Sequence, residues 1–234
     1  MTIPERAIAM RETERRLFLS PAEYVDSDHP SIRDRARALT AGISNPIDKA
    51  RALYHAVRDE IRYDPYVDYT SPETFRASNV LRAGTGYCVG KAALFAALCR
   101  ASGLPSRIGL ADVRNHLSTG RLLELIGTDV FAFHGYAEVF LETRWLKVSP
   151  TFNLSLCSKL GVPALEFEGA GDALLQPYDN AGREFMEYLV EHGSFFDVPA
   201  KYLIAEMAHL YPVLCRPGGW RDRDMEAEAN PPAR

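Results

Sequence analysis

Apolar residues recur at helical spacing through the first part of the chain. They predict one helix over "HPSIRDRARALTAG" (29–42), where Gly42 marks the end. A second helix is predicted over "SNPIDKARALYHAVRDEIRYDP" (44–65), with Asn45 as its N-cap and Pro65 after its last turn.

A third predicted helix differs from these two because it is apolar on nearly every side. It begins at or just before Cys88 and runs to about Ser102, where Gly103 provides a C-terminal cap. Between residues 89 and 99 only Lys91 is charged. A helix of this composition must be buried on most sides, and we expect it to be the central helix of the core.

After this helix the period changes to about two. The segments 106–114 and 133–150 predict strands, and the second is expected to be a hairpin that turns at Glu142–Thr143. In that register Leu141 faces Arg144, Phe140 faces Trp145, Glu138 faces Lys147 and Tyr136 faces Ser149. A shift by one residue would destroy the aromatic pair and the charged pair together.

Two helical segments are expected after the sheet, "EFMEYLVEHGS" (184–194) and "PAKYLIAEMAHLYPVL" (199–214). The order of elements predicts an α+β fold with a central buried helix on an antiparallel sheet and extra helices at both ends. We expect a single domain over residues 1–216 and a mobile tail over residues 217–234.

Composition and charge narrow the function classes. The 234 residues are 47% hydrophobic and 25% charged with a net charge of −4, which is typical of a globular protein and gives no basic footprint for nucleic acid. No run approaches the roughly 18 apolar residues of a membrane span, and the N-terminus does not resemble a signal peptide. We therefore expect a cytoplasmic protein without a nucleic-acid or membrane partner.

The four cysteines are Cys88, Cys99, Cys157 and Cys215. They are far apart and form no CxxC motif, so free thiols are expected rather than disulfides or a zinc site.

Cys88 stands where a nucleophile would be expected. A helix N-terminus stabilises a thiolate through unpaired N–H groups and the helix dipole. Gly84 and Gly86 leave space beside the sulfur, the backbone N–H of Cys88 could point at an oxyanion, and Tyr87 could flank an acyl pocket. The alternative for Cys88 is a buried core residue, and for Tyr87 a packing role.

His134 is the best placed base, because it lies at the start of a predicted strand whose rigid backbone would fix the orientation of its ring. The hairpin register puts Ser149 diagonal to it as a group that could orient the imidazole. Asn153, two strand steps further, is an amide alternative, and the residues do not decide between them. Asp112 and Asp172 are more remote candidates for a carboxylate near the site.

These residues resemble the transglutaminase-like superfamily, whose core belongs to the papain-like cysteine-enzyme group. The resemblance covers about residues 45–153 and is carried by "KARALYHAVRDEIRY", "GTGYCVGKAALFAALCRASGLPSRIG" and "HGYAEVFLETRWLKVSPTFN". It implies a Cys–His–Asp triad in which Cys88 is the nucleophile and His134 the base. The family's aspartate, four residues after the tryptophan and before a proline, is Ser149 here.

The resemblance implies a thiol-dependent hydrolase or acyltransferase that acts on an amide of a peptide or peptide-like small substrate through a Cys88 acyl-enzyme. The alternatives are amine acyl transfer in small-molecule metabolism and a non-catalytic binding domain. With Ser149 in place of aspartate, either Asn153 completes the site or the enzyme works as a dyad. No metal or organic cofactor is expected, and no acidic loop has the spacing of a calcium site. The oligomeric state is not predicted.

Overall fold

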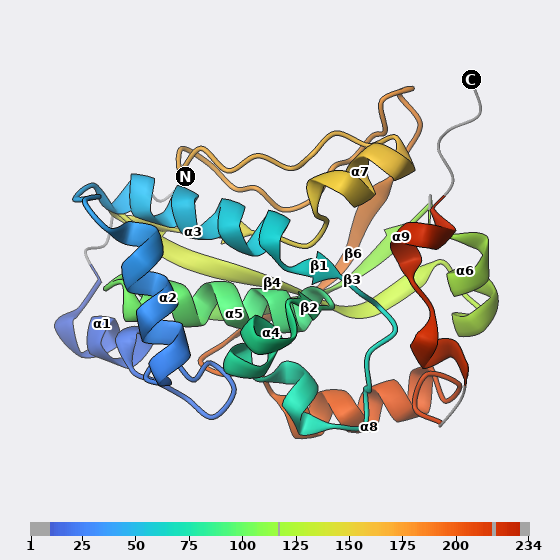
Figure 1. The fold of residues 1–234 in the computed structure, drawn as a ribbon, viewed down its shortest axis with the longest axis horizontal. Coiled ribbons are helices and arrows are strands. Elements are labelled where there is room, and N and C mark those ends of the chain that lie inside the picture. Colours follow the sequence, from blue (N-terminus) through green and yellow to red (C-terminus); the bar gives the residue numbers. More distant parts are fainter. Residues whose placement is uncertain (1–9, 117, 217–218, 230–234) are drawn as a thin grey trace, which may run out of the picture.

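The computed structural model describes residues 10–116, 118–216 and 219–229 (Figure 1). Its helices are α1 (Glu12–Leu19), α2 (Pro30–Thr40), α3 (Pro46–Glu60), α4 (Ala77–Ala83), α5 (Cys88–Ala101), α6 (Gly120–Ile126), α7 (Leu154–Leu160), α8 (Ala200–Leu210) and α9 (Met225–Glu228), with 3₁₀ turns η1 (Pro72–Phe75) and η2 (Gly219–Asp222). Its strands are β1 (Arg62–Tyr63), β2 (Thr85–Gly86), β3 (Ser106–Asn115), β4 (Val130–Leu141), β5 (Arg144–Val148) and β6 (Met186–Phe195). The fold is of the α+β class, as predicted.

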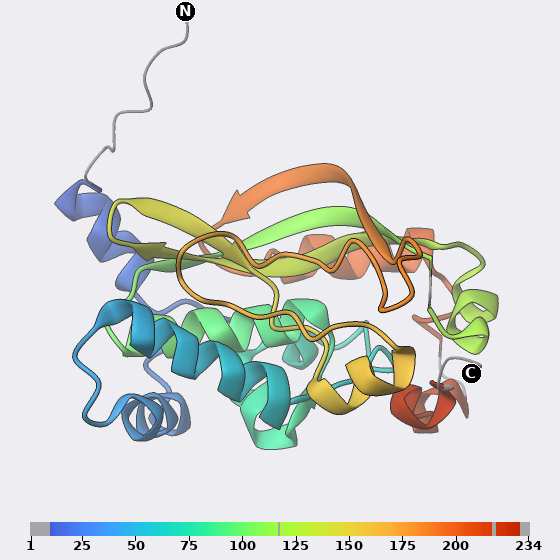
Figure 2. The same cartoon turned by 90° about the horizontal axis from the view of Figure 1, so that it is seen from above.

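Four strands form one antiparallel sheet in the order β5-β4-β3-β6, and β1 and β2 form a short parallel pair. The predicted hairpin register is confirmed at Leu141–Arg144, Phe140–Trp145 and Glu138–Lys147. Glu142 accommodates the tight turn with a φ of 55°. The buried side of this hairpin faces α5, and Figure 2 shows α3, α4 and α5 along one side of the sheet.

The central helix α5 is buried from Cys88 to Arg100, as its composition predicts. Lys91 is fully buried, and its ammonium donates to the carbonyls of Arg58 and Ile61 at the end of α3. Burial lowers the pKa of Lys91 to about 7. Because the lysine caps the end of α3, it fixes that helix against α5.

The prediction of a helix over residues 184–194 is wrong. It is the edge strand β6, which pairs antiparallel with β3. Its Met, Glu and Leu residues favour a helix locally, but the open edge of β3 offers a full row of hydrogen bonds. Two irregularities in the pairing and a φ of 91° at Gly193 obscure the alternation that would have indicated a strand.

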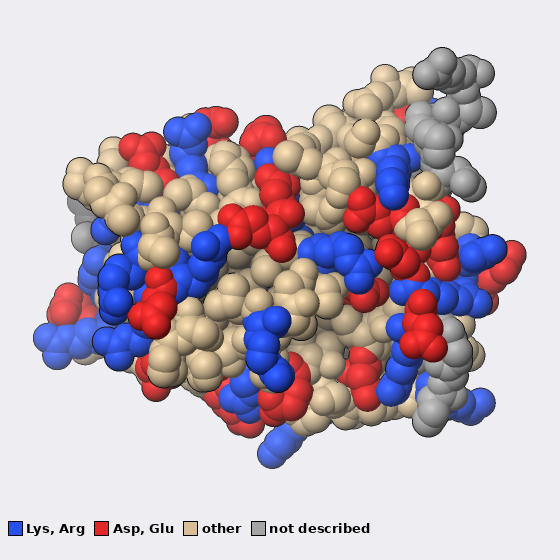
Figure 3. Space-filling model, viewed as in Figure 1, with Lys and Arg blue, Asp and Glu red and all other residues tan. Residues whose placement is uncertain are grey.

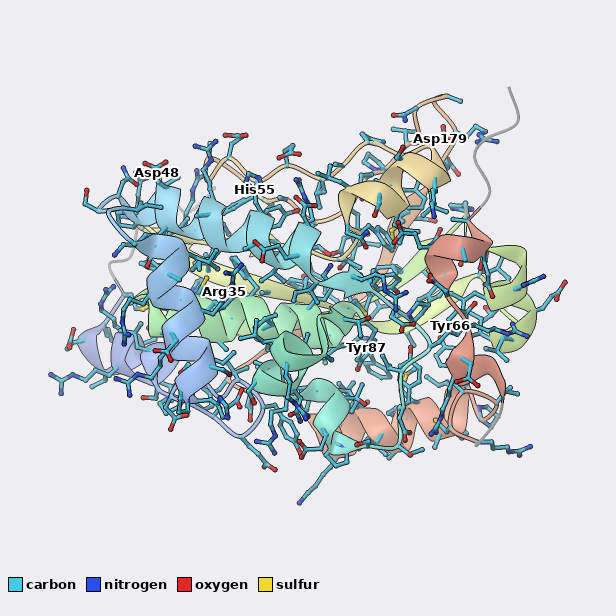
Figure 4. The ribbon with its side chains drawn as sticks, in the orientation of Figure 1. Arg35, Asp48, His55, Tyr66, Tyr87 and Asp179 are labelled. Atoms are coloured by element: carbon cyan, nitrogen blue, oxygen red, sulfur yellow. The ribbon has the colours of Figure 1, made fainter. Side chains whose placement is uncertain are left out.

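The C-terminal part of the chain packs on the body. Helix α8 forms within the predicted segment 199–214. Residues 217–218 and 230–234 of the expected tail lie outside the described residues, whereas η2 and α9 follow α8 and carry the buried Met225. Tyr66 donates a 2.6 Å hydrogen bond to Glu228 of α9, and Figure 4 shows Tyr66 beside that helix.

Acidic and basic side chains are interspersed over the face drawn in Figure 3. No helix within the described residues is long and apolar enough to cross a membrane.

Candidate active site

Cys88 is the first residue of α5, directly after the extended residue Tyr87. The backbone N–H groups of Cys88, Val89 and Gly135 point at its sulfur. The first two are donors that a helix cannot satisfy internally at its N-terminus, and the third comes from β4. The sulfur therefore lies in a small cradle of main-chain donors, the arrangement that stabilises negative charge on a thiolate or on an oxygen beside it.

Gly135 permits this contact because it has no side chain. A Cβ at Gly135 would lie 2.5 Å from the Cα of Val89 and 2.8 Å from its nitrogen, which is too close for any residue but glycine. Strand β4 thus approaches the N-terminus of α5 at backbone contact. This approach brings His134, the preceding residue, to the same cavity that Cys88 lines.

His134 is 5% exposed and is oriented by a chain of hydroxyls. Its Nε2 lies 3.3 Å from the Oγ of Ser149, and that Oγ lies 2.9 Å from the Oγ1 of Thr151. If the Ser149 hydroxyl donates to Thr151, it accepts from Nε2–H and leaves Nδ1 with a lone pair for the thiol proton. The serine itself is held in place, since its N–H donates to the carbonyl of Ala173 and its carbonyl accepts from Tyr54.

Asn153 is not brought to the imidazole. Its Oδ1 accepts from the backbone N–H of Tyr63 at 3.0 Å, and its Nδ2 donates to the Oγ of Ser155. Both polar atoms of the amide are therefore engaged elsewhere. Asn153 anchors the end of β1, where the Tyr63 ring lines the cavity.

The two remote carboxylates are also engaged away from His134. The Oδ1 of Asp172 accepts from the N–H of Lys147 at 2.9 Å. Asp112 accepts from the N–H of Phe133 at 3.0 Å and pairs with Nε2 of His192 at 2.7 Å. Asp112 therefore acts on the residue before His134 rather than on its ring.

Phe133 adopts a φ of 56°, in the left-handed region that a bulky residue rarely occupies. It belongs to a bulge in β4, since Ala111 pairs with His134 whereas Val113 pairs with Phe131. The Asp112 carboxylate holds the Phe133 amide, and the Phe133 ring packs on His192 with centroids 4.7 Å apart. The bulge sets the direction in which the next residue, His134, leaves the strand.

Burial controls the charge of both candidate catalytic groups. It raises the pKa of the Cys88 thiol to about 11, although the three backbone N–H groups act in the opposite direction. It lowers the pKa of His134 to about 4. Near neutral pH burial therefore favours a neutral thiol and a neutral imidazole, and Ser149 offers the ring no negative charge that would oppose this.

Cys88 and His134 lie in the wall of a largely apolar cavity. Tyr87 also lines it, with its ring edge-on to Tyr69 and Phe75 (Figure 4 labels Tyr87). Gly86, by contrast, pairs with Tyr63 between β1 and β2 and packs against Val80, and it is not part of the cavity wall.

Several elements of this site were not identified from the sequence. Gly135 could have been suspected, because a glycine directly after His134 in a strand marks a close backbone approach. Thr151 could have been found by extending the strand alternation from Ser149. The cavity wall formed by α8 and α9 had no recognisable signal, because its residues look like an ordinary core.

Within the described residues, no three His, Cys, Asp or Glu side chains are grouped so that they could hold a metal ion.

Comparison with known protein families gives one match. The family model described as the transglutaminase-like superfamily matches residues 33–150. No curated protein matches the chain.

Three of the solved structures that are similar to it follow. The first, described as a candidate cysteine protease from Cytophaga hutchinsonii, is 18% identical with a TM-score of 0.47 over 83% of this chain and 57% of that one. The second, a candidate protease from Parabacteroides distasonis, is 16% identical with a TM-score of 0.38 over 59% and 30%. The third, a TGase, is 19% identical with a TM-score of 0.36 over 56% and 32%. The chain thus spans less than two thirds of the length of each.

Proposed function

Because the chain belongs to the transglutaminase-like superfamily, we propose that it is a thiol-dependent hydrolase or acyltransferase that acts on an amide bond through an acyl-enzyme on Cys88. His134 is the general base and Ser149 its orienting partner. Hydrolysis is the leading form of the reaction, and transfer to an amine is the alternative outcome of the same intermediate.

The first step begins from the neutral pair. The Cys88 sulfur attacks the amide carbonyl carbon, a C–S bond forms, and the thiol proton moves to Nδ1 of His134. This atom is available because Nε2 faces Ser149. Moving the proton as the bond forms avoids a buried thiolate without a partner, which burial disfavours at this position.

The carbonyl oxygen becomes negatively charged in this step. The negative charge develops beside the sulfur, where the backbone N–H groups of Cys88, Val89 and Gly135 are available as donors. One such donor contributes about 3 kcal/mol to transition-state stabilisation. The imidazolium then gives its proton to the amide nitrogen, the C–N bond breaks, and the amine leaves.

The thioester is resolved by a second nucleophile. Water, or an amine, attacks the acyl carbon while His134 takes its proton, and the C–S bond breaks to restore the Cys88 thiol as His134 returns that proton. Attack by water gives a carboxylic acid, and attack by an amine gives a new amide.

The observation that supports this proposal best is the cradle of three backbone N–H groups around a thiol that shares a cavity with an oriented histidine. A packing cysteine has no need of donors from two elements. A non-catalytic binding domain would gain nothing from a glycine forced into backbone contact beside that thiol.

Intact-mass detection of an acyl-enzyme tests the proposal. Activated esters and amides are added to the protein in a Cys215→Ser background, because Cys215 is partly exposed whereas Cys99 and Cys157 are buried. We expect a single acyl adduct that is absent in Cys88→Ala and slowed at least about 10²-fold in His134→Ala. A protein that acquires no adduct on Cys88 with any donor would be a binding domain instead.

A further inference from the structure

We infer that the cavity beside Cys88 is an acyl-group site, and that the acyl donor carries a slender, uncharged and apolar acyl chain or single ring. This inference rests on the proposed function, since it names the substrate class of the same site. It is carried by the cavity's lining, by its dimensions and by two hydroxyls that have no partner.

The lining excludes a charged acyl group. None of the described residues in the cavity wall is Lys, Arg, Asp or Glu, and the wall is formed mainly by aliphatic and aromatic side chains. A carboxylate or ammonium group on the acyl chain would enter this space without a counter-charge, which is unfavourable in an apolar surrounding. An apolar group gains free energy from the same transfer.

The dimensions favour a slender group. The space open to the centre of a water molecule is about 50 Å³. An ordered water occupies about 10–15 Å³ on this measure, so the cavity holds a short row of atoms rather than a bulky group. Met186, Met207 and Met225 line the wall, three of the five methionines in the chain. Their flexible thioethers let the cavity adapt to chains of different length.

Two hydroxyls indicate that the cavity is a ligand site rather than a packing defect. The Oη of Tyr87, next to the nucleophile, is buried and has no hydrogen-bond partner among the described residues, and the Oγ of Ser118 is in the same condition. Both residues line the cavity, and Tyr87 is 5% exposed. Buried hydroxyls normally have a hydrogen-bond partner. We therefore expect these two to bind a neutral polar atom of a bound molecule, or a water that accompanies it.

The far wall belongs to a part of the chain beyond the family match. Leu203, Met207 and Tyr211 of the α8 region and Met225 of α9 line the cavity, whereas the family model ends at residue 150. The segment that carries Met225 is tied down by the Arg221–Asp68 pair at 2.9 Å and by the bond from Tyr66 to Glu228. This part of the acyl site is therefore supplied by elements that follow the family match.

Three matched donors test the inference: the p-nitrophenyl esters of acetic acid, hexanoic acid and adipic acid as its monoester. Each would acylate Cys88 through formation of a C–S bond and release of p-nitrophenol, with the thiol proton passing through His134. Hexanoyl and adipoyl differ in a terminal carboxylate. We expect hexanoyl to acylate Cys88 at least about tenfold faster than acetyl, and adipoyl at least about tenfold slower than hexanoyl.

A substitution in the cavity wall tests whether the preference for hexanoyl over acetyl arises in this cavity. Leu203→Trp fills the cavity from α8 and is expected to lower the hexanoyl-to-acetyl rate ratio at least about fivefold. Leu210→Trp on the exposed face of the same helix is the control and is expected to leave the ratio as it is. If Leu203→Trp does not fold, the wild-type comparison of the three esters still decides.

Acylation by acetyl or adipoyl at the hexanoyl rate or faster overturns the acyl-site inference and leaves the proposed function intact. Absence of acylation by all three esters, together with a Cys88 thiol whose alkylation does not depend on His134, overturns the proposed function and the inference with it.

Discussion

The Nε2 of His134 lies 3.3 Å from the Oγ of Ser149, so a hydroxyl orients the imidazole at the position where the resemblance to the family implies a carboxylate. A hydroxyl can fix the direction of the ring but adds no negative charge to stabilise an imidazolium. Burial lowers the pKa of His134 to about 4 and raises that of Cys88 to about 11, and no negative charge at Ser149 opposes the effect on His134, so both groups favour their neutral forms. The chemistry then depends on proton transfer during attack.

Restoring the carboxylate should activate the resting thiol. In Ser149→Asp a negative charge beside Nε2 raises the pKa of His134 and favours the thiolate–imidazolium pair. We expect alkylation of Cys88 by iodoacetamide at pH 6–7 to become at least about tenfold faster. Ser149→Asn, of nearly the same shape but without charge, is the control. Equal rates in the two variants would show that charge at this position does not control the thiol.

The orienting role of Ser149 separates it from Asn153. Ser149→Ala removes the only hydrogen bond to the imidazole that the described residues provide, and we expect turnover to fall about 5- to 10-fold with little change in stability. Asn153→Ala leaves the Tyr63 N–H unsatisfied and should lower the free energy of unfolding by about 1–3 kcal/mol, with a smaller effect on turnover. Turnover and urea unfolding measured on both variants decide; the reverse order would make Asn153 the orienting residue.

The close approach of β4 to α5 should not tolerate a methyl group. In Gly135→Ala the new Cβ would lie 2.5 Å from the Cα of Val89, so strand and helix must separate. A displacement on the order of 1 Å costs about 10²-fold in rate. We expect that loss in the acylation rate of Cys88, whereas Gly171→Ala, which meets no atom within 4 Å, should leave it unchanged. Full activity in Gly135→Ala would mean that the backbone contact is not required.

The bulge before His134 depends on Asp112. Asp112→Ala releases the Phe133 amide from a backbone conformation that costs about 1–3 kcal/mol, and we expect kcat to fall about tenfold while KM changes little. Asp112→Asn keeps an acceptor oxygen and should recover most of kcat. His192→Gln tests whether the pairing partner matters by itself. A change confined to KM, or no recovery in Asp112→Asn, would argue against a positioning role.

The parts of the fold that follow from local pattern could be predicted. The hairpin register was accessible because the pairs Phe140–Trp145 and Glu138–Lys147 align in one register only. The Phe140 and Trp145 rings contact each other, but the two charged side chains bind elsewhere: Glu138 binds Arg107 and Ser194, and Lys147 binds Glu191. Those partners come from β3 and β6, and two strands read in isolation do not reveal them.

The parts of the site that depend on long-range packing could not be predicted. Strand β6 is a strand because β3 offers an open edge, and its own residues favour a helix. The engagement of Asn153 by Tyr63 requires the β1–β2 pair, and the hold of Asp112 on Phe133 requires a bulge without a local signature. The wall formed by Leu203 and Met207 requires the docking of α8.

The most direct test of the account is the pH profile of Cys88 alkylation by iodoacetamide, in wild type and in His134→Ala. If the neutral imidazole takes the thiol proton, wild type should show a rate that is level through neutral pH and falls as the pH drops through about 4, where His134 becomes protonated. A second rise should follow toward pH 11 as the buried thiol ionises. His134→Ala should keep only the second rise. Profiles that superimpose in the two proteins would contradict the assignment of His134 as the base of Cys88.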